Sequence, residues 1–263
     1  MHFPASCAYA ALANLLERMG VDTEDADIAL EMGLPWLFVR EGDAFVSGPM
    51  LQSAEWFNLW LLPRGLMMTE TAVKRDALCK TLQSGGFAML GIRTPYGKHA
   101  VVFTGYDGAY RFLNPTHAGS GEETELVFTE GELVARTDET VMLACIERTA
   151  PQPVLLQPIL QRSVTVLREN VEAIARFAAV PHAPEAYPPM LNTLFRPLLL
   201  DGISMLTLAG ETALAQRFKA LQGALMTFLR GDRTGRLADT LLLSELSAAA
   251  EAYIRLIECR ITR

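Results

Sequence analysis

A cysteine at the start of an apolar helix is the first residue in this chain that could do chemistry. Cys7 follows a helix-breaking Pro4 and a capping Ser6, and apolar side chains then recur at helical spacing up to Gly20. The spacing therefore predicts a helix with Cys7 in its first turn. Free backbone N–H groups and the helix dipole at that end favour an anion, so they lower a thiol pKa and can bind an oxyanion.

A histidine and an asparagine occur in a predicted hairpin at 98–115. Two β-rich runs flank Asp107-Gly108, a dipeptide that favours a two-residue hairpin loop. With that loop, Asn114 opposes Val101 and lies diagonal to His99 on the same face, about 7 Å away at Cα. A longer loop with a bulge would instead place the two side chains on opposite faces.

Thiol, imidazole and carboxamide together form a set that serves nucleophilic catalysis. The thiol attacks a carbonyl, the imidazole takes and returns its proton, and a third group fixes the imidazole tautomer. Cys7, His99 and Asn114 supply these types if the helix start meets the hairpin in the fold. Each residue alone has a simpler interpretation, because an isolated cysteine is more often a small buried side chain.

These residues resemble the papain-like cysteine peptidase superfamily, specifically the bacterial branch with the double-glycine leader peptidases and the N-terminal domain of butirosin biosynthesis protein H. The matching motifs are Cys7 before Ala-Tyr-Ala-Ala-Leu-Ala-Asn-Leu-Leu, His99 before Ala-Val-Val-Phe-Thr-Gly-Tyr-Asp, and Asn114 before Pro115. The resemblance covers about the first 150 residues. It implies Cys7 as the nucleophile, His99 as general base and acid, and Asn114 as the residue that orients the imidazole.

The oxyanion donor of that family has no direct counterpart here. The leader peptidases resemble papain in carrying a Gln six positions before the cysteine, where this chain has Met1. The butirosin-type proteins tend to carry a His immediately before the cysteine, where this chain has Ser6. We expect His2 or Gln52 to supply a substitute donor beside the Cys7 backbone N–H.

Composition indicates a folded protein without a nucleic-acid partner. The 263 residues are half hydrophobic, enough for one large domain or two modest ones. The formal net charge is -7 and no basic cluster appears, so neither nucleic acid nor a membrane surface is an expected partner. We find no apolar run of membrane-spanning length and no signal-peptide pattern, and we therefore expect a cytoplasmic protein.

Cysteine usage argues against a disulfide scaffold or a metal centre. The chain has four widely separated cysteines: Cys7, Cys79, Cys145 and Cys259. None is in Cys-x-x-Cys spacing, and we expect the last three to be core residues. The alternative, a zinc site, would gather Cys7 with His2, His99 and His117. Phosphate loops and dinucleotide fingerprints are also missing, so no metal and no cofactor is expected.

Helical patterns come first in the chain and strand patterns follow. Proline, glycine and capping signals predict helices after the first one at 22–32, 49–62 and 72–82. Strand patterns occur at 87–92, 99–105, 109–113 and 140–146. This order predicts an α+β fold class for a first domain at 1–150, in agreement with the papain-like halves.

A second domain is predicted to be all-α. Near Thr149 prolines interrupt the chain, and from there on strand patterns vanish. Apolar residues then recur at helical spacing in three or four segments, which predicts a helical bundle at 151–263. An alternative role for this domain is the interface of a homodimer.

Two functions compete at this point. The leading hypothesis is acyl transfer through a thioester on Cys7, by a peptidase or amidase or by an acyltransferase. Its substrate would be a peptide or an acyl thioester, free or bound to a carrier protein. The alternative is a catalytically silent binding module that keeps a papain-like cleft and a helical interaction domain.

Overall fold

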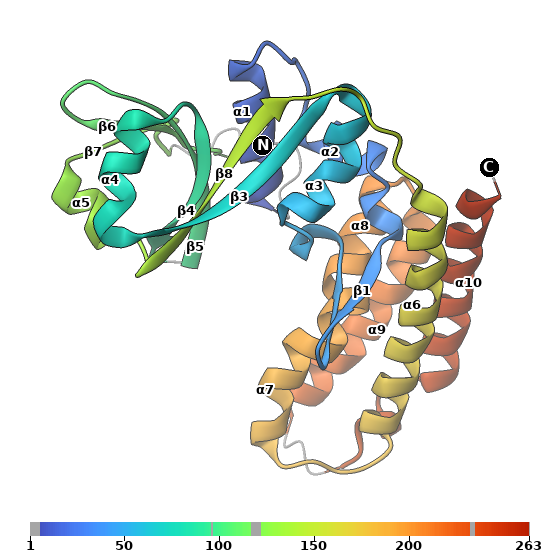
Figure 1. The fold of residues 1–263 in the computed structure, drawn as a ribbon. Helices are drawn as coiled ribbons and strands as arrows, with labels where there is room; N and C mark the ends of the chain where they lie inside the picture. Colours follow the sequence, from blue (N-terminus) through green and yellow to red (C-terminus); the bar gives the residue numbers. More distant parts are fainter. Residues whose placement is uncertain (1–5, 96, 117–121, 232–234, 263) are drawn as a thin grey trace. The chain divides into compact units, whose positions relative to one another are not determined.

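The chain forms two compact units in a computed structural model that describes residues 6–95, 97–116, 122–231 and 235–262 (Figure 1). Unit 1 contains Met1–Met32 and Gln52–Val154, and unit 2 contains Gly33–Leu51 and Leu155–Arg263. This division differs from the predicted cut after residue 150, because Gly33–Leu51 belongs with the C-terminal segment.

Unit 1 is a mixed α/β unit, so the α+β class is confirmed in this coarse form. Its described helices are α1 (Cys7–Arg18), α2 (Asp25–Glu31), α3 (Ala54–Leu61), α4 (Arg75–Ser84) and α5 (Glu130–Ala135). Its described strands are β3 (Leu66–Lys74), β4 (Ala88–Thr94), β5 (Gly97–Tyr106), β6 (Tyr110–Leu113), β7 (Glu125–Phe128) and β8 (Thr140–Arg148). Within the described residues they make one antiparallel sheet in the order β3-β8-β4-β5-β6-β7.

The two faces of strand β5 have different partners (Figure 1). Val101 and Phe103 lie in a buried apolar cluster together with Leu78 of α4 and Leu133 of α5. Since side chains alternate along a strand, Ala100 faces the other side, where α1 packs against β5. The sheet therefore separates this core from the helix that begins at Cys7.

The β5–β6 turn is one residue longer than predicted. A two-residue loop would pair Tyr106 with Ala109, but Tyr106 pairs with Tyr110 and the loop comprises 107–109. Gly108 has a φ of 101°, a conformation that favours glycine in such a turn. The predicted two-residue turn was wrong.

A bulge cancels the extra loop residue. The register shifts between Phe103 and Gly105, and beyond the shift Val102 pairs with Leu113, as a two-residue loop would require. The hairpin thus has a longer loop, with one extra residue before β6, and a bulge, with one extra residue in β5. The expectation that a longer loop with a bulge would separate His99 from Asn114 was wrong, because the two extra residues compensate each other. The predicted register is restored at the end of the hairpin that carries His99.

The helix predicted at 72–82 was wrong in its first residues. Leu66–Lys74 forms β3, an edge strand paired along its length with β8, and α4 begins only at Arg75. The β-branched residues Thr69, Thr71 and Val73 alternate in this segment, which favours a strand. The predicted strands at 87–92, 99–105, 109–113 and 140–146 are confirmed as β4, β5, β6 and β8.

Unit 2 is mainly helical, as predicted for 151–263, but it also contains a hairpin from the N-terminal half. Its hairpin strands are β1 (Phe38–Glu41) and β2 (Ala44–Ser47). Its described α-helices are α6 (Leu156–Ala178), α7 (Tyr187–Met190), α8 (Gly202–Leu208), α9 (Thr212–Arg230) and α10 (Leu243–Ile261). Among the described residues, no helix combines the length and apolar character needed to cross a membrane.

Buried hydrogen bonds hold the 33–51 segment in unit 2. The Phe38 N–H donates to Ser163 Oγ at 3.0 Å, and the Tyr253 hydroxyl donates to the Pro35 carbonyl at 2.6 Å. The Tyr253 ring also contacts Phe38 edge-on, with ring centroids 5.3 Å apart. These side chains are buried among apolar neighbours, where polar groups need such partners.

Replacing Tyr253 by Phe should lower the free energy of unfolding by about 1–3 kcal/mol, because the Pro35 carbonyl loses its donor while the ring stays. Urea denaturation followed by circular dichroism measures the change. Tyr106→Phe, at an exposed tyrosine of unit 1, is the matched control and should change stability by less than about 0.5 kcal/mol. Equal effects of both substitutions would contradict a specific role of the Tyr253 hydroxyl.

Candidate active site

Cys7 is the first residue of α1, as the sequence predicts. Ser6 occupies the N-cap position with extended backbone angles, φ -154° and ψ 115°. Its hydroxyl makes no capping hydrogen bond and is buried without a partner among the described residues. The side chain of Ser6 therefore does not cap the N–H groups of the first turn, and the positive end of the helix dipole at Cys7 favours an anion there.

Strand β5 contacts the Cys7 thiol with two consecutive residues. The Ala100 backbone N–H donates to Cys7 Sγ at 3.4 Å, and the His99 side chain is hydrogen-bonded to the same thiol. Cys7 itself is partly buried. The helix start and the hairpin, which are about 90 residues apart in the sequence, thus meet at one sulfur atom.

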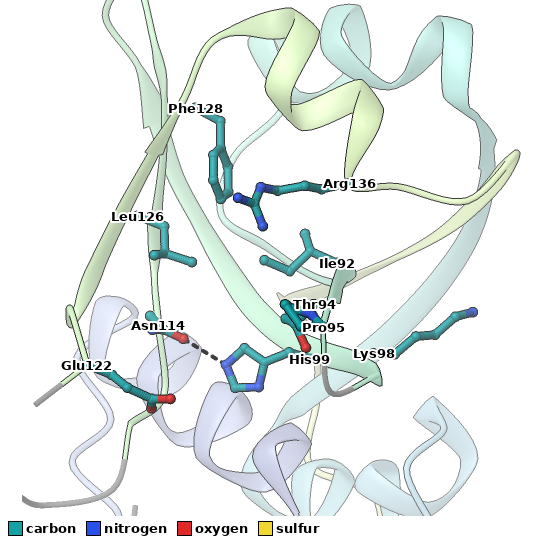
Figure 2. Close-up of a pocket in the computed structure, with 10 residues that line it drawn as sticks. All are labelled: Ile92, Thr94, Pro95, Lys98, His99, Asn114, Glu122, Leu126, Phe128 and Arg136. Atoms are coloured by element: carbon teal, nitrogen blue, oxygen red, sulfur yellow. Dashed lines mark hydrogen bonds between the residues drawn. The ribbon is translucent and has the colours of Figure 1, made fainter. Parts of the chain in front are cut away.

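Asn114 fixes the orientation of the His99 ring. Asn114 Oδ1 lies 2.7 Å from His99 Nε2, the contact drawn in Figure 2. The Asn114 amide group donates in turn from Nδ2 to the Glu123 carbonyl at 2.7 Å, so Oδ1 is the acceptor and His99 Nε2 carries a proton. Since Nε2 is occupied, Nδ1 is the ring nitrogen left for the Cys7 thiol.

The electrostatics favour a charged Cys7–His99 pair. Burial opposes ionisation of the thiol, but hydrogen bonds from His99 and the Ala100 N–H, together with the His99 charge, outweigh it and lower the pKa of Cys7. The hydrogen bond to Cys7 raises the pKa of His99 against the opposing effect of burial, and Asn114 and the charge of Glu122 raise it further. A proton on His99 and a negative charge on Cys7 therefore stabilise each other.

The other cysteines lack this environment. Burial raises the pKa of Cys79 and of Cys145, which lie in or against the core of the sheet as predicted. Cys259 is exposed, so its predicted place in a core was wrong. Cys259 lies in α10 on the exposed side of the helix.

The smaller of two cavities at the site contains the thiol. It has a volume of about 200 Å³ and is lined by Cys7, Gln52, Glu70, His99 and Ala100 among others. Gln52, one of the two predicted oxyanion donors, therefore borders the space in which a carbonyl bound to Cys7 would lie.

His2, the other predicted donor, lies outside the described residues, as does His117 of the alternative zinc site. Across 6–95, 97–116, 122–231 and 235–262, no three His, Cys, Asp or Glu side chains gather as metal ligands.

The larger cavity contains residues that the sequence did not single out. It has a volume of about 370 Å³ and borders His99 and Asn114 (Figure 2). Phe128 and Arg136 line its far end in this view. A sequence signal that could have indicated this region is the capping box of Thr129 and Glu132, the signature of a helix start; Arg136 caps the end of that helix, α5.

Comparisons with known proteins do not identify the site. No protein family model matches the sequence, and no curated protein matches it either. The geometry of Cys7, His99 and Asn114 therefore has to support any functional interpretation. The structure brings these three side chains together and adds Gln52 at the edge of the cavity that contains the thiol.

Replacing Cys7 by Ala should lower the pKa of His99, because the hydrogen bond that contributes most to raising it is lost. Asn114→Ala should also lower it, through loss of the second hydrogen bond. NMR titration of the imidazole Cε1–H signals measures both changes. Cys79→Ala, at a buried thiol away from the ring, is the control and should leave the His99 titration unchanged. An unchanged His99 pKa in Cys7→Ala would contradict the thiol–imidazole pair.

Proposed function

We propose that this protein is a thiol enzyme of acyl transfer, with Cys7 as nucleophile, His99 as general base and acid, and Asn114 as positioning residue. The observation that supports this most directly is the hydrogen-bonded series of Cys7, His99 and Asn114 at a helix start. A thiol with a lowered pKa beside an oriented imidazole is the arrangement that nucleophilic catalysis by cysteine requires.

The proposed reaction has two stages. The Cys7 thiolate attacks a carbonyl carbon, a C–S bond forms, and the carbonyl electrons move to oxygen. As the tetrahedral intermediate collapses, the bond to the leaving group breaks and protonated His99 gives its proton to that group. Water or an amine then attacks the thioester while His99 takes its proton, and the thiolate of Cys7 is regenerated.

Two groups near the thiol can donate to the developing oxyanion. One is the backbone N–H of Cys7 at the start of α1, where the helix dipole favours negative charge. The other is the Gln52 side-chain amide, which borders the same cavity as the thiol. In this proposal Gln52 takes the part that a glutamine upstream of the cysteine plays in papain-like peptidases.

The papain-like assignment and the substrate class belong to the same proposal. Helices followed by an antiparallel sheet, with the cysteine on the first helix and the histidine on a central strand, support that fold family. The substrate is a peptide or an acyl thioester, and the chemistry requires no cofactor. Four thiols without a disulfide support the cytoplasm as the compartment.

Native alkylation should show a reactive thiolate at Cys7. Iodoacetamide should modify Cys7 below pH 7 faster than Cys259, which is exposed and serves as an internal reference thiol. The pH profile of Cys7 should shift upward in His99→Ala, because the hydrogen bond and charge that favour the thiolate are lost while burial continues to oppose ionisation. Peptide mass spectrometry locates the label at each pH.

An unreactive Cys7, or one with the same profile in wild type and His99→Ala, would contradict the enzyme proposal. The binding module with a papain-like cleft would then be the better interpretation, because that cleft needs no activated thiol.

Replacing Gln52 by Ala should lower kcat by about two to three orders of magnitude with a substrate that the wild type turns over, the usual effect of removing one oxyanion donor. Gln161→Ala, at an exposed glutamine of unit 2, is the matched control and should leave kcat unchanged. His2→Ala, tested in parallel, separates the two predicted donors. Unchanged rates in both Gln52→Ala and His2→Ala would remove side-chain oxyanion donation from the mechanism.

A further inference from the structure

His99 lies between two cavities, and the larger one does not include Cys7 among its lining residues (Figure 2). Its volume of about 370 Å³ is within the range of roughly 300–1,000 Å³ typical of small-molecule sites. Ile92, Leu126 and Phe128 give it apolar walls. The size and the walls of this cavity are therefore suited to a small ligand, which would lie next to the imidazole of His99.

The chemistry of thiol acyl transfer gives the two cavities different tasks. The acyl group becomes bonded to Cys7 and stays in the cavity that contains the thiol. The leaving group receives its proton from His99, so it has to lie against the imidazole. Lys98 and His99 line both cavities, which makes the larger one the continuation of the site on the leaving-group side.

Arg136 is held in place at the end of this cavity that is remote from His99 (Figure 2). Its guanidinium carbon lies 5.2 Å from the centre of the Phe128 ring, a cation–π distance. Its backbone N–H donates into the last turn of α5, and its carbonyl accepts the Arg93 N–H at 2.6 Å. Backbone hydrogen bonds therefore fix the main chain of Arg136, and the Phe128 ring contacts its guanidinium group.

Arg136 makes no salt bridge among the described residues. The charge of Glu132, one helical turn earlier, interacts with Arg136, but its carboxylate accepts hydrogen bonds from the Thr129 N–H and hydroxyl, both at 2.8 Å. The other cation of this cavity, Lys98, is paired with Asp138 at 2.5 Å. Arg136 is therefore the cation that is positioned to bind an anionic group of a ligand.

The opposite end of the cavity carries negative charge. Glu122 lies beside the His99–Asn114 pair in Figure 2, and its charge favours the protonated form of His99. The cavity is consequently dipolar, with a carboxylate at the reaction centre and a guanidinium at the far end. A ligand with an amine at one end and a carboxylate at the other matches this arrangement.

We infer that this cavity binds the leaving group of the reaction, and that the leaving group is an amino acid or short peptide with a free C-terminal carboxylate. The inference rests on the proposed acyl-transfer function. The planar guanidinium of Arg136 holds the carboxylate with two N–H donors, and the apolar walls contact the side chain of the released residue. In the reverse direction the same cavity binds the acceptor amine.

The bond changes of this step balance. Cys7 Sγ forms a bond to the carbonyl carbon, the C–N bond to the released residue breaks, and the proton on His99 moves to the amine nitrogen. The products are the thioester on Cys7, neutral His99 and a free amine whose carboxylate stays on Arg136.

Binding of glycyl-leucine and glycyl-leucinamide to the full-length Cys7→Ala variant tests this inference without requiring turnover. The two dipeptides differ by one carboxylate, and titration calorimetry or ligand-observed NMR gives both affinities. We expect the carboxylate form to bind about tenfold or more tightly than the amide, as a charge-assisted hydrogen-bonded pair gives. Arg136→Gln in the same background should abolish the difference, and Arg136→Lys should restore part of it.

Arg111→Gln is the matched control for the lost charge. Arg111, a partly exposed residue of β6, is paired with Asp107 and does not line the cavity, so its removal should leave the preference for the carboxylate intact. Equal affinity for the two dipeptides, or binding of neither up to millimolar concentrations, would overturn the inference. A normal alkylation profile of Cys7 with no carboxylate preference would reject this leaving group while leaving the acyl-transfer proposal standing.

Discussion

The contact between the Cys7 thiol and strand β5 is the interaction on which the candidate site depends. Two neighbouring residues of one strand make it, His99 through its side chain and Ala100 through its N–H. The pairing of β5 with β6 extends only to Val102, and beyond that point the Ala100 N–H donates to the thiol at the start of α1. The lowered pKa of Cys7 and the raised pKa of His99 both follow from this contact with β5.

The orientation of the imidazole depends on a less obvious constraint, the register of the β5–β6 hairpin. A longer turn alone would place Asn114 and His99 on opposite faces. The bulge between Phe103 and Gly105 removes that offset, and the side chain of Thr104 donates to the Arg111 carbonyl at 3.2 Å where the ladder is interrupted. The turn and the bulge are therefore coupled features: a change in the length of one is compatible with the site only if the other changes as well.

Much of unit 1 could be predicted from local pattern, because each element there carries its own signals. The helix start at Cys7 and the strands β4, β5, β6 and β8 follow from local pattern and alternation. The contact of His99 with Asn114 was predicted from a two-residue turn that is not formed, and it occurs because an unpredicted bulge restores the register. Strand β3 could not be predicted so easily, because its pairing with β8 is about 70 residues away in sequence and overrides a mixed local pattern. The role of Arg136 in a cavity is likewise a property of the fold, since nothing in its neighbouring residues indicates which strand its side chain will face.

The assignment of Gly33–Leu51 to unit 2 has a consequence for how the chain folds. Contacts between Phe38 and Ser163 and between Pro35 and Tyr253 span 125 and 218 residues. During synthesis from the N-terminus, the β1–β2 hairpin leaves the ribosome long before α6 and α10 exist, and an isolated two-stranded hairpin is at best marginally stable in water. Unit 2 can therefore complete its core only after the last helix has been made. Unit 1 meanwhile has to fold around a segment that is still unfolded, and contacts of such long range make folding slow.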